Sequence, residues 1–225
     1  IIYDRNGVAL VSNEAPQAGE EFPKRIYPKM NGFSHLLGFI KYPAKDSSGF
    51  YYEEEYSPQD GVEQYLNEII SGSNGLKITE ADAALNVVSE SLIEKAVDGK
   101  DAYLSIDVRI QEKMYREIAS LSERVGFKGG AGILLDINSG EIIAMTSFPE
   151  YNSQIMTDGQ NEEIIKSYAV SKNNPFLNRL IAGLYTPGSV IKPFLAFAAL
   201  EEEVIDPAKT IVSTGKLVVP NPYFP

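Results

Sequence analysis

The sequence contains no cysteine and one histidine among its 225 residues. Without cysteine, thiol catalysis, disulfide bonds and thiolate metal sites are all excluded. A Ser-His-Asp triad or a histidine metal site would have to rest on His35 alone. Acid–base chemistry at neutral pH must therefore fall to lysine, tyrosine or a carboxylate with a shifted pKa. We expect neither a metal nor a cofactor.

Basic residues are also scarce relative to acidic ones. The chain has 20 Lys+Arg against 31 Asp+Glu, a net charge of −11. This balance argues against nucleic acid as the main partner, because phosphate binding needs clustered cations. No apolar stretch reaches the roughly 18 residues that cross a bilayer. The chain opens at Ile1 without an initiator Met and stops at no obvious domain end, so we expect a piece of a longer protein.

The N-terminal part predicts short strands and loops. An Asn-Gly turn between apolar runs indicates a β-hairpin over residues 1–11. Residues 12–23 are polar and contain proline, which is typical of a loop. Residues 44–58 are polar and tyrosine-rich, with three consecutive glutamates, and predict a solvated loop. Residues 76–104 carry a weak strand pattern.

One helix is expected in this part. Asp60 is a favourable N-cap, and Glu63 three residues later completes the pattern of a capping box. The apolar residues repeat at helical spacing and predict one buried face: Val62, Tyr65, Leu66, Ile69 and Ile70.

A second helix and an apolar hairpin follow. Asp107 predicts the N-cap and Gly126 the C-terminal end of this helix. Its apolar stripe consists of Ile110, Met114, Ile118, Leu121 and Val125. Residues 133–145 predict a hairpin that is apolar almost throughout, hence central and covered on both sides. Together the patterns predict an α+β fold with an elongated, mostly β part over residues 1–100 and the opening of an α/β part over residues 101–225.

The stretch that carries chemistry lies at residues 185–200. A Pro-Gly turn precedes a run that is apolar on every face, as in a buried helix. Ser189 and Lys192 lie three residues apart in its first turn and share a face. Pro193 is tolerated only within that turn.

These two residues can form an activated nucleophile. A serine hydroxyl needs a base within hydrogen-bond reach, and a lysine loses its proton more readily when it is buried near the positive end of a helix. The backbone N–H of Ser189 offers one donor of an oxyanion hole. With one histidine in the chain, Ser189 and Lys192 are the serine-activating pair available. An exposed N-cap serine beside an incidental lysine remains the alternative. A second S-x-x-K match, Ser213 to Lys216, lies in a strand-like context and predicts no activity.

With this motif the sequence resembles the class B penicillin-binding proteins, which are peptidoglycan DD-transpeptidases, and among them the elongation type. The matching stretches run in order along nearly the whole chain: Asp4 to Gly7, Arg25 to Pro28, His35 to Gly38, Gly61 to Tyr65, Ser105 to Asp107, Asp136 to Met145, Asn178-Arg179 and Tyr185 to Pro193.

The resemblance implies a function for each part. Residues 1–100 would be a non-catalytic pedestal of the dimerisation type, and residues 101–225 the N-terminal portion of a transpeptidase domain whose C-terminal half is absent. Ser189 would be acylated by the penultimate D-Ala of a stem peptide and release the terminal D-Ala. An amine of a neighbouring stem peptide would then take the acyl group and form the cross-link. Lys192 would be the general base, and β-lactams would acylate the same serine.

The resemblance also implies partners and a location. The expected partners are peptidoglycan stem peptides, β-lactam antibiotics, a membrane glycan polymerase and the scaffold proteins of wall elongation, with a role in cell shape. The expected location is the extracytoplasmic face of the bacterial cytoplasmic membrane, anchored by an N-terminal transmembrane helix that this chain does not contain.

The chain departs from the family pattern in three places. Neither S-x-N nor K-[ST]-G follows Ser189, and Ser171-Lys172-Asn173 precedes it, in the wrong order. Residues 13–24 are shorter than the head subdomain usual there. We therefore expect the 225-residue chain by itself to be inactive. The alternatives are a non-catalytic ectodomain that binds wall-elongation partners, or a DD-carboxypeptidase or β-lactam hydrolase.

Four other residues invite a functional interpretation. His35 is expected to be a packed structural histidine, because it lies far in sequence from Ser189. Tyr185 is either a lining residue of the acyl pocket or a core tyrosine. Asn178 and Arg179 are expected to anchor the loop that enters the catalytic helix.

Overall fold

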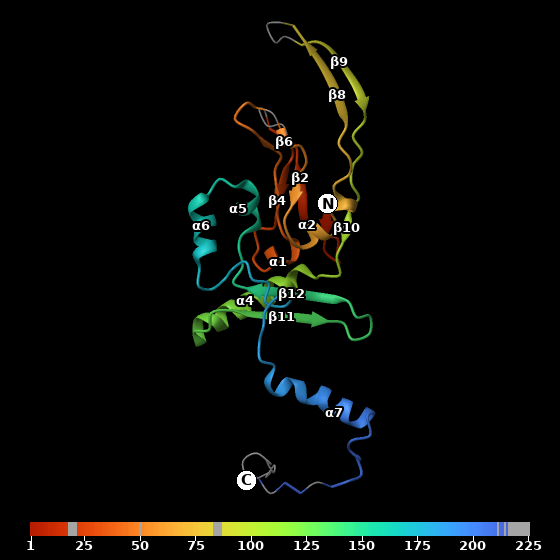
Figure 1. Cartoon of the computed structure of the whole chain (residues 1–225), viewed down its shortest axis with the longest axis vertical. Coiled ribbons are helices and arrows are strands. Elements are labelled where there is room, and N and C mark those ends of the chain that lie inside the picture. The colour runs from red at the N-terminus through yellow and green to blue at the C-terminus, as the bar shows by residue number, and fades with distance from the viewer. Residues whose placement is uncertain (18–21, 50, 83–86, 211, 214, 216–225) are drawn as a thin grey trace, which may run out of the picture. The chain divides into compact units, whose positions relative to one another are not determined.

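The computed structural model describes the chain except residues 18–21, 50, 83–86, 211, 214 and 216–225. It divides into two units, Ile1–Gly183 and Leu184–Pro225. Helices and strands are mixed along the chain (Figure 1), in agreement with the predicted α+β class. No helix in the described ranges is both long and apolar enough to span a membrane.

The strands of the first unit form a four-stranded sheet and several two-stranded sheets. The larger sheet has the order β10-β1-β2-β3, with β10 parallel to β1 and the other neighbours antiparallel. Its strands are β1 (Ile2–Tyr3), β2 (Ala9–Glu14), β3 (Lys24–Ile26) and β10 (Ala102–Tyr103). The antiparallel pairs are β4 (Ile40–Lys41) with β7 (Ser57–Pro58), β5 (Ala44–Lys45) with β6 (Tyr51–Glu53), β8 (Leu76–Ala81) with β9 (Val87–Glu94), and β11 (Gly130–Leu135) with β12 (Ile142–Phe148).

The helices are short except for one. Those of the first unit are α1 (Ser34–Leu37), α2 (Gly61–Tyr65), α3 (Asn67–Ile70), α4 (Val108–Val125), α5 (Ser153–Asp158) and α6 (Glu162–Val170). The second unit contains a 3-10 helix, η1 (Gly188–Ile191), which continues directly into α7 (Lys192–Glu201).

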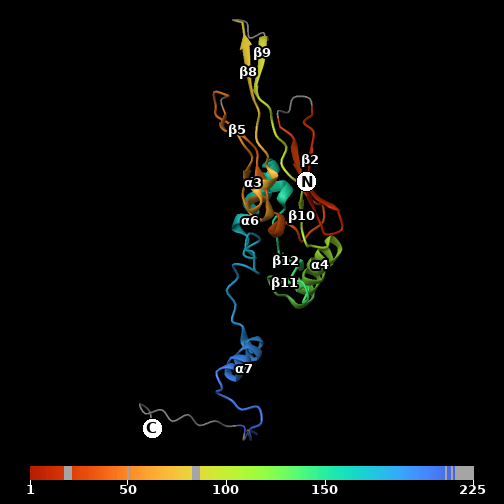
Figure 2. The same ribbon diagram turned by 90° about the vertical axis from the view of Figure 1, so that its right-hand side faces the viewer.

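The N-terminal hairpin is confirmed, and it joins segments far apart in the chain. β1 pairs with β2, and β2 continues to Glu14 and pairs with β3, so part of the loop predicted at residues 12–23 is strand. The loop predicted at residues 44–58 likewise contains the β5–β6 hairpin. β10 and α4 bring residues 102–108 against β1, and this placement makes the core of the first unit: Ile2, Leu10, Val11, Tyr27, Phe33, Leu37, Ala102 and Val108. Figure 2 shows β10 beside the N-terminus.

The helix predicted after Asp60 is divided. Asp60 caps its N-terminus as expected, accepting a hydrogen bond from Gly61 N. The backbone then leaves helical geometry at Leu66 (φ −100°, ψ 11°), and α3 begins at the next residue. Tyr65 and Ile69, predicted to be buried, are 88% and 49% exposed. The face that packs on the core is narrower than predicted, because three of the five apolar residues lie against it, spaced four residues apart: Val62, Leu66 and Ile70.

The helix predicted from Asp107 to Gly126 is confirmed at both ends. Its predicted stripe is only partly right: Met114 and Ile118 lie against the glycines of β11, whereas Val125 is 66% exposed. The buried positions are instead Val108, Gln111, Tyr115 and Ser122. The helix is turned toward β12 because Gln111 makes hydrogen bonds there, as described below.

The β11–β12 hairpin is confirmed, but the prediction that it is covered on both sides is wrong for this chain. Ile133, Leu134 and Leu135 are 46%, 41% and 50% exposed. α4 packs on the hairpin, and β11 and β12 make up the whole of their sheet among the described residues.

Removing the N-cap of α4 should destabilise the protein measurably. The Asp107 carboxylate accepts hydrogen bonds from Arg109 N at 3.0 Å and from Asn6 Nδ2 at 3.0 Å. Hydrogen bonds, first of all from the Arg109 side chain, hold the pKa of Asp107 well below its ordinary value. We expect Asp107→Ala to lower the free energy of unfolding by about 1–2 kcal/mol at neutral pH, and Asp107→Asn by less.

This effect should depend on pH with a defined sign. A depressed pKa stabilises the fold above the unfolded-state value near 4 and loses that contribution as the pH falls through the folded-state value. Urea unfolding at pH 7 and pH 3 should therefore show a smaller gap between wild type and Asp107→Ala in acid. An equal gap at both pH values contradicts the assignment of Asp107 as an ionised cap.

Candidate active site

Ser189 and Lys192 lie where a 3-10 turn leads into α7. Gly188 adopts φ +58°, a left-handed conformation that suits glycine, and the predicted Pro-Gly turn is confirmed. The backbone N–H of Lys192 donates to Ser189 O. Side chains three apart eclipse in a 3-10 helix, so the two residues are on the same side of the turn. Pro193 lies at the start of α7, as predicted.

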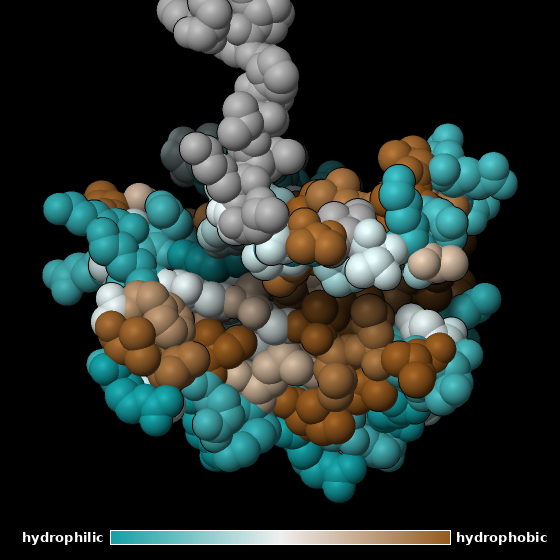
Figure 3. Space-filling view, turned by 90° about the horizontal axis from the view of Figure 1, so that it is seen from below, coloured by the Kyte–Doolittle hydropathy of each residue, from teal (hydrophilic) through white to brown (hydrophobic). Residues whose placement is uncertain are grey.

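The surroundings of this pair differ from the prediction of a dry, buried helix. Ser189 and Lys192 are exposed, and in the described part of the chain no hydrogen bond or ion pair engages either side chain. Phe194 and Phe197 of α7 are 74% and 68% exposed. The reason is that the described residues of the second unit supply no apolar layer for α7. Figure 3 shows hydrophobic side chains gathered on the face seen from below.

The second S-x-x-K match, the S-x-N match and Tyr185 lie in different environments. Ser213 lies outside helices and strands, and Lys216 is outside the described residues, so this second match remains a prediction. Asn173 of the misplaced S-x-N match accepts a hydrogen bond from Arg179 Nη2 through its backbone oxygen, which is a structural role. Tyr185 is 65% exposed and is not a core tyrosine in this chain.

The structural role expected for Asn178 and Arg179 is confirmed. Arg179 is 8% exposed, and its backbone N–H donates to Ser147 Oγ of β12 at 3.1 Å. Its guanidinium reaches Asn173 O at 2.5 Å and Leu177 O at 3.3 Å. Asn178 Oδ1 accepts from Leu180 N at 3.2 Å. The loop after α6 is thereby fixed on β12.

The prediction that His35 is structural also agrees with its environment. His35 is 6% exposed and its ring meets that of Tyr151 edge-on, with centroids 5.3 Å apart. Burial lowers the pKa of His35, so the neutral ring is favoured. Within the described residues no group of three or more His, Asp or Glu side chains could hold a metal ion.

Sequence reasoning missed Gln111, which is fully buried on α4. Its Oε1 accepts from Met145 N at 2.6 Å, and its Nε2 donates to Met145 O and to Gly32 O, both at 2.5 Å. The amide thus bonds both backbone groups of one β12 residue and also the loop before α1. A glutamine one turn from Val108 and one turn from Tyr115 was the available signal, because a polar residue on a buried helix face needs partners.

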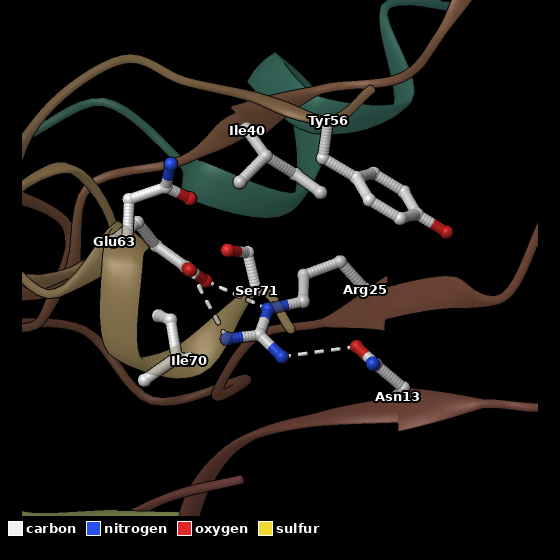
Figure 4. A pocket seen from close by; sticks show the side chains of 8 residues that line it. Asn13, Arg25, Ile40, Tyr56, Glu63, Ile70 and Ser71 are labelled. Atoms are coloured by element: carbon white, nitrogen blue, oxygen red, sulfur yellow. Dashed lines mark hydrogen bonds and ion pairs between the residues drawn. The ribbon is translucent and has the colours of Figure 1, made fainter. Parts of the chain in front are cut away.

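Glu63 was predicted to complete a capping box, and the structure gives it another role. Its carboxylate is 3% exposed and accepts from Arg25 Nε at 2.7 Å and Nη2 at 3.0 Å. Tyr27 Oη donates to the same carboxylate at 3.0 Å, and Asn13 Oδ1 accepts from Arg25 Nη1 at 2.9 Å. Arg25 and Glu63 line a pocket of about 70 Å³. Figure 4 shows the ion pair among the side chains that line it. Arg25 of β3 thus engages both oxygens of the Glu63 carboxylate.

Two family models match this chain. The penicillin-binding protein dimerisation domain matches residues 19–104, and the penicillin binding protein transpeptidase domain matches residues 130–224. Ser189 and Lys192 lie within the second match.

The relatives carry consistent names. The chain is 30% identical to the peptidoglycan D,D-transpeptidase MrdA of Haemophilus influenzae, covering 88% of this chain and 31% of the relative. It is 28% identical to MrdA of Acinetobacter baumannii (87% and 29%) and 28% identical to the peptidoglycan D,D-transpeptidase FtsI of Escherichia coli K12 (82% and 27%). The chain therefore spans about a third of the length of these relatives.

Solved structures agree with the α+β fold. The crystal structure of Pseudomonas aeruginosa PBP2 in complex with WCK 5153 matches with a TM-score of 0.75 and 26% identity, covering 98% of this chain and 44% of that one. Penicillin binding protein 2X from Streptococcus thermophilus matches with a TM-score of 0.64 and 28% identity, covering 83% and 26%.

Proposed function

Since the chain belongs to the class B penicillin-binding proteins, we propose that it is part of a serine D-Ala-D-Ala transpeptidase that cross-links peptidoglycan. The observation that carries the proposal is the Ser189–Lys192 pair on one side of the turn into α7, within the segment that matches the transpeptidase domain.

In the proposed mechanism Ser189 Oγ attacks the carbonyl carbon of the penultimate D-Ala, and its proton passes to Lys192 Nζ. The backbone N–H of Ser189 stabilises the oxyanion. Lys192 then protonates the departing amine, and the C–N bond breaks to release the terminal D-Ala. The amine of a second stem peptide attacks the acyl-enzyme carbonyl and gives its proton to Lys192. Lys192 passes this proton to Ser189 Oγ as the acyl–oxygen bond breaks, which restores the free serine. β-Lactams acylate Ser189 in the same way, with opening of their ring.

The proposal requires that other residues of the whole protein pack against α7, because the described residues leave its apolar side chains exposed. Apolar side chains on every face of a helix are stable only when they are buried. The relatives are about three times as long as this chain, so the whole protein has further residues to pack on α7. Burial there would also remove water from around Lys192. Desolvation lowers the pKa of a lysine, and a general base needs this shift in order to be uncharged.

The proposal extends to organisation and location. Residues 1–100 act as a non-catalytic pedestal and residues 101–225 open the transpeptidase domain, with support from the two matched families. The partners are stem peptides and β-lactams together with a membrane glycan polymerase and elongation scaffold proteins. The protein acts on the extracytoplasmic side of the cytoplasmic membrane, where its substrate is.

A direct test is D-Ala release by the full-length protein from a peptide ending in D-Ala-D-Ala, with a labelled D-amino acid as acceptor. A transpeptidase releases D-Ala and incorporates the label into the peptide. D-Ala release without incorporation indicates a carboxypeptidase. Neither product with a correctly folded protein supports the non-catalytic scaffold and overturns the proposal.

A further inference from the structure

The pocket beside the Arg25–Glu63 pair has walls from several elements of the first unit. β2, β3, β4, α2 and α3 each supply side chains that line it. Asn13 of β2 and Ser71 after α3 are exposed, so the pocket can be reached from solvent. Its volume of about 70 Å³ leaves room for roughly two water molecules, or for one small polar group of a larger ligand.

The buried guanidinium of Arg25 brings hydrogen-bond donors to this pocket (Figure 4). Arg25 is 9% exposed, and three of its five side-chain N–H groups bind Glu63 and Asn13. The described residues supply no acceptor for the other two, one on Nη1 and one on Nη2. Asn13 adds the N–H groups of its Nδ2, since its Oδ1 is the atom that accepts from Arg25. These donors fit a carbonyl oxygen of a ligand.

The pocket also carries acceptors and apolar surface. Asn67 and Ser71 line it, and neither side chain makes a hydrogen bond to another residue that the structure describes. Each has an oxygen that can accept from an N–H of a ligand. Ile40 and Ile70 supply apolar wall. A carbonyl oxygen, an N–H and a methyl group are the three parts of an acetamido group, which therefore matches the lining.

The ion pair in the wall selects a neutral ligand group. Arg25 and Glu63 neutralise each other at 2.7 Å, and both line the pocket. A cation would meet the guanidinium and an anion would meet the carboxylate, in a chain whose net charge is −11. Since a charge that leaves water without a free counter-charge loses its hydration uncompensated, the pocket favours an amide over a carboxylate or an amine.

The ring of Tyr56, which lies on the pocket wall, favours a sugar as the carrier of this amide. Its hydroxyl donates to Pro23 O at 3.0 Å. The rings of Phe22 and Tyr42 meet it edge-on, with centroids 6.1 and 5.8 Å away, so it is held in place. The face of an aromatic ring is negative and attracts C–H groups, and one side of a pyranose ring presents such groups.

We propose that this pocket is a carbohydrate site that binds the acetamido group of an N-acetylated amino sugar. Ser189 is not among its residues, so the site is not part of the serine chemistry. The glycan strands of peptidoglycan consist of such sugars. The site then holds the strand whose stem peptides are cross-linked, and this choice of natural ligand rests on the proposed function.

Isothermal titration calorimetry of the full-length protein with the tetramer of N-acetylglucosamine tests the proposal. We expect saturable binding that Asn67→Ala weakens about tenfold, the effect of losing one hydrogen bond to the ligand. Gln64→Ala shortens an exposed amide on α2 that does not line the pocket; it is the matched control and should bind as wild type does. Cellotetraose, which has hydroxyls in place of the acetamido groups, should bind at least tenfold more weakly.

The proposal is overturned if wild type does not bind the tetramer, if cellotetraose binds equally well, or if Asn67→Ala binds as wild type does. Displacement of the tetramer by a stem peptide without sugar assigns the pocket to peptide amides and overturns it too. Ser189→Ala should bind the tetramer normally, so failure of this site and failure of the transpeptidase assay are separate results. Should Asn67→Ala not fold, Ser71→Leu, at an exposed position, obstructs the pocket and takes its place.

Discussion

Ser189→Ala in the full-length protein is expected to lower the rate of acylation by a fluorescent penicillin about a million-fold, to background. The reason is that the methyl group has no oxygen to attack the β-lactam carbonyl, and binding alone forms no covalent bond. Labelling followed over time on denaturing gels measures this rate. Ser213→Ala, which alters the second S-x-x-K match, is the control and should label as wild type does.

Lys192 belongs to the same prediction. A general base contributes about 10²–10⁴-fold, so Lys192→Ala should acylate slowly but detectably, and Lys192→Arg should not rescue it because an arginine does not give up its proton. Equal labelling of Ser189→Ala and wild type would show that the nucleophile is elsewhere. Normal labelling of Lys192→Ala would contradict only the assignment of Lys192 as the general base and would leave Ser189 as the nucleophile.

Breaking the buried ion pair between Arg25 and Glu63 should have the largest effect on stability. Glu63→Gln leaves the guanidinium of Arg25, itself 9% exposed, without its charged partner. Removing one partner of a buried pair costs about 3–5 kcal/mol, and the glutamine amide offers one acceptor oxygen where the carboxylate offered two to Arg25 and Tyr27. Urea unfolding monitored by circular dichroism should show this loss as a shift of the midpoint to lower urea.

The double variant Arg25→Met with Glu63→Met separates pairing from packing. Replacing both partners by apolar residues of similar volume leaves no buried charge behind, so much of the lost stability should return. Glu117→Gln, which breaks the exposed Lys113–Glu117 pair on α4, should not move the midpoint. If Glu63→Gln unfolds like Glu117→Gln, the Arg25–Glu63 pair does not hold β3 to α2.

The sequence correctly predicted the turns and helix ends that are determined by neighbouring residues. The Asn-Gly turn of the first hairpin, the Asp107 cap and the Pro-Gly turn before Ser189 all depend on residues within one turn of each other. The family was likewise apparent from motifs in the right order. These elements needed no knowledge of distant neighbours.

The errors arise where a distant residue decides. Glu63 has the spacing of a capping box, in which its carboxylate would accept from the backbone N–H of Asp60. The carboxylate instead accepts two charge-assisted hydrogen bonds from Arg25 on β3, which are stronger. Gln111 bonds α4 to β12, and the buried face centres on Gln111, so that Ile110 and Leu121 of the predicted stripe are 37% and 40% exposed. Neither contact can be read from helical periodicity.

For the candidate site too, the local geometry could be predicted from the sequence and the burial could not. The sequence predicts the turn and the placement of Ser189 and Lys192, because both follow from spacing in a short helix. It also predicts a dry environment, which depends on which surfaces meet α7. The described residues leave α7 exposed, and apolar composition alone names no partner surface for it.

The most direct measurement is peptide mapping by mass spectrometry of the full-length protein after reaction with benzylpenicillin. We predict a single adduct with the mass of the intact penicillin on the peptide that contains Ser189, with fragmentation placing it on that residue. An adduct on any other residue, or no adduct on a folded protein, would contradict the assignment of Ser189 as the nucleophile.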